Sequence, residues 1–153
     1  MIKIQRSTIV FKTILGNFLL KIYNNKIKSL YPTNYEPSIL VDKRSAYIVK
    51  NIKNYLNNKS KIKNFTSDPE GTNFEKKVWN EIKKINFGNT ISYSEIANKI
   101  KSSPRAVGNA CANNPCLLII PCHRVINLNG NIGNYVIGSE IKKFLLNLEN
   151  NLK

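Results

Sequence analysis

The spacing of hydrophobic residues changes once in the N-terminal part of the chain, from a strand period to a helix period. Residues 2 to 31 contain short apolar runs that predict strands, and Asn24-Asn25 predicts a tight hairpin turn between two of them. The apolar positions of these runs are Ile9, Phe11, Phe18, Leu20, Ile22, Ile27 and Leu30. From about Lys43 to Asn57, apolar residues recur at helical spacing, with lysines on the opposite face. The inner face of this predicted helix comprises Ile48, Ile52, Tyr55 and Leu56.

A polar stretch from Asn57 to Gly71 predicts a connection to a second unit, which begins with another helix. The apolar stripe of that helix is Phe74, Val78, Trp79, Ile82 and Ile85. Because Trp79 lies on this stripe, we expect it to fill the core and not to bind a ligand. Gly88 is expected to end the helix.

Two short helices joined by a tight turn are predicted next. The segment Ser92-Tyr93-Ser94-Glu95 fits a capping box that begins a helix running to about Ile100. Pro104 suits the first position of the following helix, which continues to about Ala112. This is a helix-turn-helix arrangement, although many pairs of core helices show the same pattern.

The second of these helices has little side-chain bulk. Arg105 stands at its start, and its small residues are Ala106, Gly108, Ala110 and Ala112. Such a helix can bring its backbone close to another surface, and its N-terminal dipole favours phosphate. Packing against a neighbouring helix would use the same small residues, so DNA contact is favoured only together with the charge of the chain.

The chain carries 24 Lys and Arg residues against 9 acidic ones, a formal charge of +15. Such an excess attracts polyanions, with nucleic acid the first candidate and an anionic membrane surface the second. A composition bias would also account for it, since Lys, Asn and Ile are plentiful throughout the chain.

Length and cysteine content limit the class of protein. The 153 residues, 42 % of them hydrophobic, suit one ordinary domain or two small ones that share a core. The cysteines are Cys111, Cys116 and Cys122, and an odd count without a signal peptide argues against a secreted disulfide framework. No segment approaches the length that spans a bilayer. We therefore expect a soluble, cytoplasmic protein with reduced thiols.

An apolar run between Pro115 and Pro121 leads directly into Cys122 and His123, the only histidine. A thiol is a useful nucleophile only as thiolate, and His123 is the obvious base. Contact between these adjacent side chains needs a sharp turn; otherwise a water relays the proton, and a carboxylate from elsewhere orients the base. A buried structural cysteine beside an incidental histidine would give the same dipeptide.

The chain is predicted to end in a helix. It follows a loop rich in Gly and Asn, from Asn127 to Asn134, and Ser139 can cap it. Its inner face comprises Ile141, Phe144, Leu145 and Leu148, and Glu149 lies at its end.

The longer string Ile120-Pro121-Cys122-His123-Arg124-Val125 resembles the active-site signature of the O6-alkylguanine-DNA alkyltransferases, also called methylated-DNA–protein-cysteine methyltransferases. The resemblance covers residues 72 to 150, in the order and spacing of that family. Its other elements are Ile91-Ser92-Tyr93 with Glu95-Ile96-Ala97, Arg105-Ala106-Val107-Gly108, Asn114-Pro115, Gly133-Asn134-Tyr135 and Lys143-Phe144-Leu145-Leu146 with Glu149. The first 65 residues carry no motif of their own.

The resemblance implies a mixed α/β (α+β) fold of two domains. Residues 1–66 would form a small N-terminal sheet-and-helix domain of the RNase H-like type. Residues 67–153 would form a mainly helical, winged helix-turn-helix-like domain that binds DNA and holds the alkyl acceptor. The implied partner is double-stranded DNA containing alkylated guanine, and the protein is expected to be a monomer that does not bind membranes.

The implied activity is that of a methylated-DNA–[protein]-cysteine S-methyltransferase, a suicide enzyme of DNA repair. The alkyl group of O6-alkylguanine, in a flipped-out nucleotide, passes irreversibly to Cys122; O4-alkylthymine is a second substrate that the resemblance leaves open. His123 relays a proton through water, and Glu149 orients it. Asn114 braces the active-site turn, and Tyr93 donates a hydrogen bond to the departing guanine.

The resemblance also implies contacts to DNA and to the damaged base. Arg105 would fill the space left by the flipped nucleotide, while the helix that it begins lies in the minor groove. The other implied DNA-binding residues are Ser92, Tyr93, Ala106 and Ala112. The implied substrate pocket consists of Leu117, Val125, Tyr135 and Val136, with the backbone around Val125 reading the amino edge of guanine.

No metal or organic cofactor is expected. Some relatives bind zinc in the N-terminal part, but that part of this chain has neither Cys nor His. The chain departs from the family pattern in two places. Residues 136–139 replace a Ser-Gly-Gly type of sequence, and Leu117 stands where some members have proline or a small residue. Both differences bear on which alkyl groups are accepted.

Three other readings remain open at this point. A non-catalytic relative binds alkylated DNA but has tryptophan in place of the cysteine, and Cys122 argues against it. A plain DNA-binding regulator would have incidental thiols. A metal site could be built from Cys111, Cys116, Cys122 and His123, although their spacing differs from the common zinc motifs.

Overall fold

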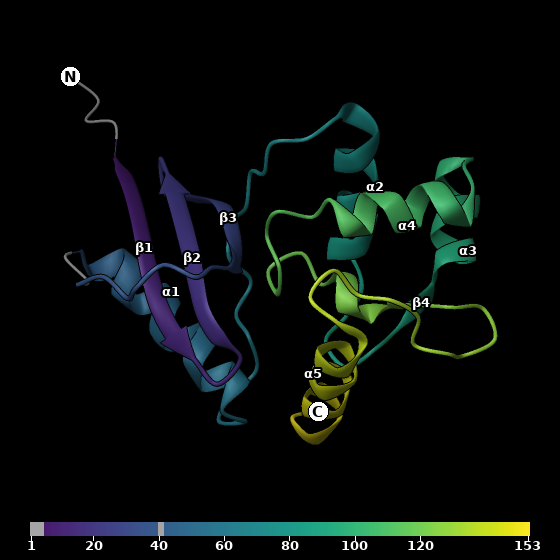
Figure 1. Cartoon of the computed structure of the whole chain (residues 1–153). Coiled ribbons are helices and arrows are strands. Elements are labelled where there is room, and N and C mark those ends of the chain that lie inside the picture. Colours follow the sequence, from purple (N-terminus) through teal and green to yellow (C-terminus); the bar gives the residue numbers. More distant parts are fainter. Residues whose placement is uncertain (1–4, 40–41) are drawn as a thin grey trace.

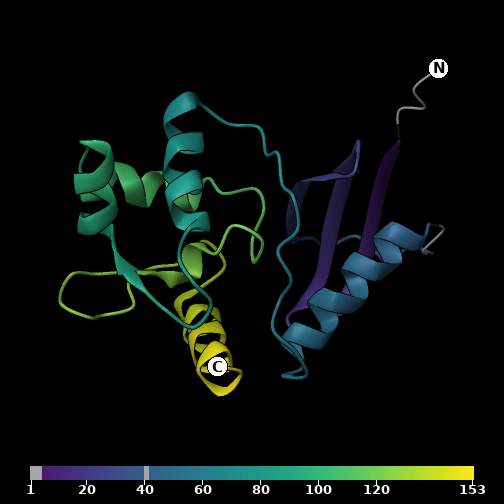
Figure 2. The same ribbon diagram turned by 180° about the vertical axis from the view of Figure 1, so that it is seen from behind.

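A three-stranded antiparallel sheet with one helix on its face forms the N-terminal part of the computed structural model, which describes residues 5–39 and 42–153 (Figure 1). The strands, in the order β1-β2-β3, are β1 Arg6–Thr13, β2 Gly16–Tyr23 and β3 Lys26–Pro32. Seen from behind, α1 (Lys43–Leu56) crosses in front of the sheet (Figure 2). Asn24 and Asn25 have φ angles of 46° and 63°, as a tight hairpin turn of this type requires, so the predicted turn is confirmed. Residues 2–4 of the predicted strand region lie outside the described residues.

Helix α1 forms where the period of the apolar residues predicted it. Asp42 caps its first turn, because its carboxylate accepts the Ser45 backbone N–H at 2.8 Å. The predicted inner face of the helix, from Ile48 to Leu56, is buried against the sheet, and Tyr55 is fully buried.

The C-terminal part is mainly helical. Its helices are α2 Asn73–Lys83, α3 Tyr93–Ile100, α4 Pro104–Ala112 and α5 Ser139–Asn151. Two short parallel strands, β4 Ile91–Ser92 and β5 Val125–Ile126, pair beside the 3-10 turn η1 Cys122–Arg124. The capping box of Ser92 with Glu95 and the place of Pro104 at the start of α4 are as predicted. These elements, with the sheet, confirm the mixed α/β fold.

Two predicted helix boundaries were wrong. Helix α2 ends at Lys83 and not at Gly88, which lies in a later turn with a φ of 76°. Ser139 is the first residue of α5 and caps nothing, because the N-cap position belongs to Gly138, whose φ of 109° suits glycine.

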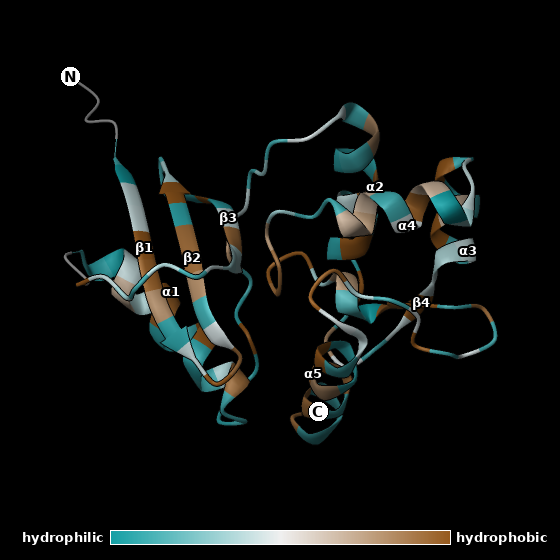
Figure 3. Cartoon of the chain, viewed as in Figure 1, coloured by the Kyte–Doolittle hydropathy of each residue, from teal (hydrophilic) through white to brown (hydrophobic). Residues whose placement is uncertain are grey.

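The two parts of the chain share one core. The backbone of β3 pairs with the loop before Cys122, since Leu30 donates to the Pro115 carbonyl at 2.8 Å and Leu117 donates to the Leu30 carbonyl at 2.9 Å. Figure 3 shows this hydrophobic loop, coloured brown, beside β3. Buried apolar residues from the sheet, α1, α2, α4 and α5 form a single cluster. The boundary at residue 66 stays a prediction, because the packing is continuous across it.

Trp79 is buried in this cluster, as predicted, and its indole N–H donates to the Ala110 carbonyl at 2.8 Å. That bond ties α2 to α4 and so fixes the helix that begins with Arg105 relative to the core. Within residues 5–39 and 42–153, no helix combines the length and the apolar character that crossing a bilayer would need.

Candidate active site

Cys122 is held by a tight turn and by the side chain of Asn114. Its N–H donates to the Ile120 carbonyl at 2.8 Å, which closes the turn around Pro121. The Asn114 amide nitrogen lies 2.9 Å from the Ile120 oxygen and 3.2 Å from the Cys122 sulfur. The other end of the amide accepts the N–H of Cys116 at 2.9 Å. Asn114 therefore fixes the turn and points a hydrogen-bond donor at the sulfur.

The Cys122 thiol is protonated at rest. Burial raises its pKa well above the usual value, a neighbouring thiol on Cys111 adds to the rise, and Asn114 and Lys142 oppose it. The side chain is only 2 % exposed. A thiolate at this position thus requires a base that takes the proton.

A single carboxylate, that of Glu149, organises the region behind Cys122. It accepts hydrogen bonds from His123 Nε2 at 2.7 Å, from two nitrogens of Arg124 at 2.8 and 3.0 Å, from the Tyr55 hydroxyl at 2.8 Å and from the Gly88 N–H at 3.2 Å. Burial by itself would raise the pKa of Glu149, but the hydrogen bonds from His123 and Arg124 outweigh it and lower this pKa to about 2. The carboxylate is therefore charged at neutral pH.

His123 is fully buried, and the charged carboxylate sets its tautomer. Because Glu149 can only accept, Nε2 carries the proton and Nδ1 carries the lone pair. Nδ1 has no hydrogen-bond partner among the protein atoms described. Burial lowers the pKa of His123, and the bond to Glu149 only partly offsets this, so the ring is neutral near pH 7. It is an oriented base with a free nitrogen.

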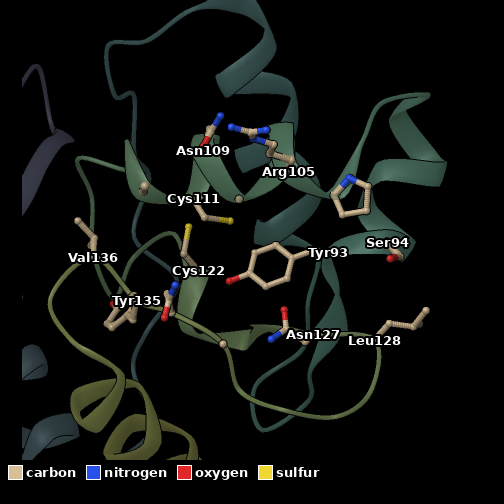
Figure 4. A pocket seen from close by; sticks show the side chains of 15 residues that line it. Tyr93, Ser94, Arg105, Asn109, Cys111, Cys122, Asn127, Leu128, Tyr135 and Val136 are labelled. Carbon is tan, nitrogen blue, oxygen red and sulfur yellow. The ribbon is translucent and has the colours of Figure 1, made fainter.

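A cavity of about 620 Å³ opens in front of Cys122 (Figure 4). Residues from α3, α4, η1 and the loop before α5 line it, among them Tyr93, Arg105, Cys111, Cys122, Tyr135 and Val136. Arg105 lies on its outer rim, near the start of α4, and the ring of Tyr93 forms a wall beside the sulfur (Figure 4). The cavity can hold a flat aromatic group against a nucleophile.

Lys142 is fully buried beside this cavity. Its ammonium donates to the carbonyls of Val125 and Asn134 at 2.6 and 3.1 Å and to the Tyr93 hydroxyl at 3.2 Å. Burial lowers its pKa to about 8. The contacts join α5 to β5, to the loop at Asn134 and to Tyr93, so Lys142 fixes three walls of the site.

Comparison with known proteins identifies the family. Residues 73–151 match the family model described as the DNA binding domain of 6-O-methylguanine DNA methyltransferase. Over 150 residues, the chain is 41 % identical to the inducible methylated-DNA–protein-cysteine methyltransferase of Bacillus subtilis, a match that covers 92 % of the chain and 82 % of that relative. The chain belongs to the 6-O-methylguanine DNA methyltransferase family.

Two further members of this family show how far the similarity extends. The methylated-DNA–protein-cysteine methyltransferase of Methanocaldococcus vulcanius is 55 % identical over 78 residues, which cover 51 % of the chain but only about half, 48 %, of that relative's own length. The crystal structure of Mycobacterium tuberculosis OGT in complex with DNA is 30 % identical, with a TM-score of 0.78 over 92 % of the chain and 90 % of its own. The N-terminal part thus follows a known member of the 6-O-methylguanine DNA methyltransferase family in fold.

The structure brings most of the predicted site residues to one place. The predicted residues that line the cavity are Tyr93, Arg105, Ala112, Cys122, Tyr135 and Val136. Asn114, His123 and Glu149 lie behind Cys122 and reach the sulfur or one another. Ser92 and Ala106 do not line the cavity; Ser92 is 5 % exposed, with its hydroxyl accepting the Glu95 N–H. The roles of these residues in DNA binding and catalysis stay predictions.

Two residues expected in the pocket, Leu117 and Val125, do not line this cavity. Leu117 does not line the cavity, because its backbone pairs with β3 and its side chain is buried there, 2 % exposed. Val125 does not line it either, because its side chain is fully buried and its carbonyl accepts a hydrogen bond from Lys142; the expected contact of the backbone around Val125 with guanine stays a prediction. Leu117 therefore does not limit the size of the pocket directly.

The sequence did not predict that four further residues belong to this site. Arg124 was part of the quoted motif, and a buried arginine needs an acid nearby, which Glu149 supplies. Lys142 interrupts the apolar face of α5, a signal that it has buried partners. Tyr55 was expected in the core, but nothing local showed that its hydroxyl reaches Glu149. Cys111 was considered only as a ligand of the alternative metal site and not as part of the alkyl-acceptor site.

The alternative metal site has no support from the geometry of the residues described. Among them no group of three or more His, Cys, Asp and Glu side chains could hold a metal ion. Cys116 faces away from the other thiols, with its sulfur 3.2 Å from the Lys28 carbonyl, and His123 Nε2 is engaged by Glu149.

Proposed function

We propose that this protein repairs DNA by transferring the alkyl group of O6-alkylguanine to the sulfur of Cys122, once per molecule. The observation that carries the proposal is the placement of Cys122 at the wall of a base-sized cavity, with the oriented base His123 and the carboxylate of Glu149 directly behind it. Membership of the 6-O-methylguanine DNA methyltransferase family supports the same reading.

Removal of the thiol proton is the first requirement of this reaction. Because the Cys122 thiol is protonated at rest, the proton has to pass to His123, whose free Nδ1 is the available acceptor. A water between the sulfur and Nδ1 would carry it, as the side chain of His123 is turned toward Glu149. The resulting imidazolium would be stabilised by the charged Glu149 at 2.7 Å. Asn114 would stabilise the thiolate through its bond to the sulfur.

The transfer itself is a displacement at the alkyl carbon. The sulfur forms a bond to that carbon while the bond from the carbon to O6 of guanine breaks, and guanine leaves with the electron pair. Tyr93 is suited to assist, because Lys142 donates to its oxygen and so leaves the Tyr93 hydrogen free to donate to the base. The product is a thioether, which has no comparable leaving group, so the protein is consumed.

Access to the cavity requires the damaged nucleotide to leave the helix, at a cost of a few kcal/mol. The rim residue Arg105, exposed at the start of α4, could fill the vacated space in the duplex. The small residues of α4 allow its backbone to lie in a minor groove, and the helix N-terminus favours phosphate. Double-stranded DNA that contains alkylated guanine is therefore the proposed partner.

The shape of the cavity bears on the range of adducts. Val136 is 50 % exposed on its rim and supplies no hydroxyl, so recognition of the guanine oxygen would depend on Tyr93 and on backbone groups. Because Leu117 lies outside the cavity, its bulk does not exclude large alkyl groups. We propose O6-methylguanine as one substrate and leave O4-alkylthymine to the same assay.

One incubation tests the proposal. The reduced protein is mixed with an equimolar duplex that contains O6-methylguanine, and its intact mass is measured. We expect one methyl increment, located on Cys122 by peptide mapping, and none for Cys122→Ser. Binding of the alkylated duplex without any mass increment would instead indicate a non-catalytic DNA-binding protein and would refute the transfer.

Two further variants test the proton relay. His123→Ala and Glu149→Gln should each slow alkylation without abolishing DNA binding, and the double variant should be little slower than the slower single one, since groups that act as a unit are not additive. Losses that multiply fully would show that the two residues do not form one relay.

A further inference from the structure

Two free thiols, and not one, line the proposed alkyl-acceptor cavity. Cys111 lies in the last turn of α4 and is 8 % exposed, while Cys122 begins η1 and is 2 % exposed. Figure 4 shows the two sulfur atoms next to each other at the cavity wall. The Cys111 thiol is also among the causes that raise the pKa of Cys122. The two sulfurs therefore lie side by side at the wall of one cavity.

The proposed transfer uses only one of these thiols. The Cys122 sulfur accepts a hydrogen bond from the Asn114 amide, whereas no step of the proposed transfer requires a sulfur at position 111. The third cysteine belongs to a different environment, because the Cys116 sulfur lies against the backbone carbonyls of β3, 3.2 Å from that of Lys28. The pairing of thiols is thus specific to Cys111 and Cys122.

We propose that Cys111 is a resolving thiol, which converts peroxide-oxidised Cys122 into a disulfide that a thiol reductant can reverse. In the first step the Cys122 thiolate attacks a peroxide oxygen, the O–O bond breaks, the peroxide leaves as an alcohol or water after protonation, and Cys122 becomes a sulfenic acid. In the second step the Cys111 sulfur attacks the Cys122 sulfur, the S–O bond breaks, and water leaves with the Cys111 proton. The peroxide is reduced and the two thiols are oxidised together by two electrons.

The order of the two steps follows from the contacts of each sulfur. Asn114 donates to the Cys122 sulfur at 3.2 Å, and this donor stabilises an anion there and not on Cys111. Cys122 is also the sulfur next to the base His123. Cys122 is therefore the first thiol to react, and Cys111 the second.

Proximity decides what happens to the sulfenic acid. A second thiol beside it on the same cavity wall attacks within the molecule, at an effective concentration far above that of dissolved peroxide. Disulfide formation needs the two sulfurs to approach to bonding distance, about 2.0 Å, and the cavity wall that both thiols line is where they would meet. Further oxidation of Cys122 to the irreversible sulfinic acid is thereby prevented.

A consequence rests on the proposed function. In the disulfide, Cys122 has no free sulfur and cannot accept an alkyl group, but the protein is not consumed. Reduction would return it to the alkyl-accepting form. A peroxide would thus suspend repair reversibly instead of destroying a protein that works only once.

The experiment uses the full chain in four forms: unsubstituted, Cys111→Ser, Cys111→Ala and, as the matched control, Cys116→Ser. Each is reduced, treated with excess hydrogen peroxide and analysed by intact mass. We expect the unsubstituted protein and Cys116→Ser to lose two hydrogens, and both Cys111 variants to gain oxygen atoms. Chymotryptic cleavage between Leu117 and Cys122 in Cys116→Ser should leave two peptides joined by the disulfide.

A second readout measures alkyl acceptance before peroxide, after peroxide and after dithiothreitol, each form being compared with its own reduced state. Acceptance by the unsubstituted protein and by Cys116→Ser should be lost with peroxide and return with dithiothreitol. In the Cys111 variants the loss should persist, because a sulfinic acid is not reduced by thiols.

The outcomes separate the inference from the function on which it rests. Oxygen gain without a disulfide in the unsubstituted protein would overturn the role of Cys111, and this holds even if neither Cys111 variant folds. Full recovery of both Cys111 variants would overturn it as well. A protein that forms the disulfide but accepts no alkyl group when reduced would refute the proposed function and leave the thiol pair intact.

Discussion

Replacement of Glu149 by glutamine would measure how far the fold depends on one buried carboxylate that joins the two parts of the chain. Glu149 on α5 is 1 % exposed and binds Tyr55 on α1 as well as His123 and Arg124 on η1. Glutamine keeps the size of the side chain, but one oxygen becomes an NH2 group. If the nitrogen replaces Oε2, its N–H groups face the N–H groups of Arg124 and Gly88, and the hydrogen bonds that both donate to Oε2 are lost.

The expected cost follows from the charge that is left behind. Arg124 is 6 % exposed, and without Glu149 its guanidinium is buried and lacks a counter-charge. Loss of one partner of a buried ion pair typically costs about 3–5 kcal/mol. For a protein of this size, that cost lowers the melting temperature by roughly 6–20 °C. The matched control is Tyr55→Phe, which removes one neutral donor to the same carboxylate and should cost about 1.5–3 kcal/mol.

Thermal melts of the three proteins at several pH values provide the assay. The folded-state pKa of Glu149 lies near 2, below its usual value of 4.5, so its contribution to stability is fully present above about pH 4.5 and is lost as the pH falls toward 2. The melting temperature of the unsubstituted protein should therefore fall more steeply in this window than that of Glu149→Gln. The same melting temperature for both at pH 7, or parallel acid dependence, would show that the carboxylate does not stabilise the fold.

Three other predictions concern the reaction and its partner. Arg105→Ala should slow repair of a duplex on the order of tenfold, because support for base flipping is lost, while reaction with free O6-alkylguanine should change little; equal losses would refute the role. Binding to undamaged duplex should weaken steeply with salt and show little sequence preference. Affinity that does not change with salt would indicate that the +15 charge, most of which lies in residues 1–66, reflects a composition bias and not a DNA-binding surface. Methylation of Cys122 weakens one of the two hydrogen bonds that the Asn114 amide donates and adds a methyl group beside a packed turn, so the alkylated protein should melt about 2–8 °C lower. A melting temperature at or above that of the unmodified protein would contradict this.

The local sequence determined the helices and the N-terminal strands, but it did not predict the short pair β4 and β5. Periodicity, the Asn24-Asn25 turn and the capping box at Ser92 depend on neighbours within a few residues, so they could be interpreted one segment at a time. The prediction failed at two helix boundaries, where a residue typical of a helix end has another role in the structure. Gly88 suited a helix end, but its φ of 76° serves a turn whose N–H binds Glu149. Ser139 suited an N-cap, but the cap position belongs to Gly138.

The alkyl-acceptor candidate was also determined by the sequence, because the string around Cys122 is contiguous and distinctive. The family resemblance that identified this string also implied Leu117 and Val125 as pocket residues. Their side chains instead turn into the core. A position near a nucleophile in sequence lies on the same segment but not necessarily on the same side of it.

Only the tertiary structure decided which distant groups meet. Tyr55 and Glu149 are 94 positions apart, yet a 2.8 Å hydrogen bond joins them. The partners of Lys142 and the placement of Cys111 and Cys122 at one cavity wall likewise depend on how α4, α5 and η1 pack together. Periodicity shows that a face is buried but carries no information on which residues of other elements it meets. The protonation states of Cys122, His123 and Glu149 follow from these contacts between distant residues, so packing decided the chemistry of the site.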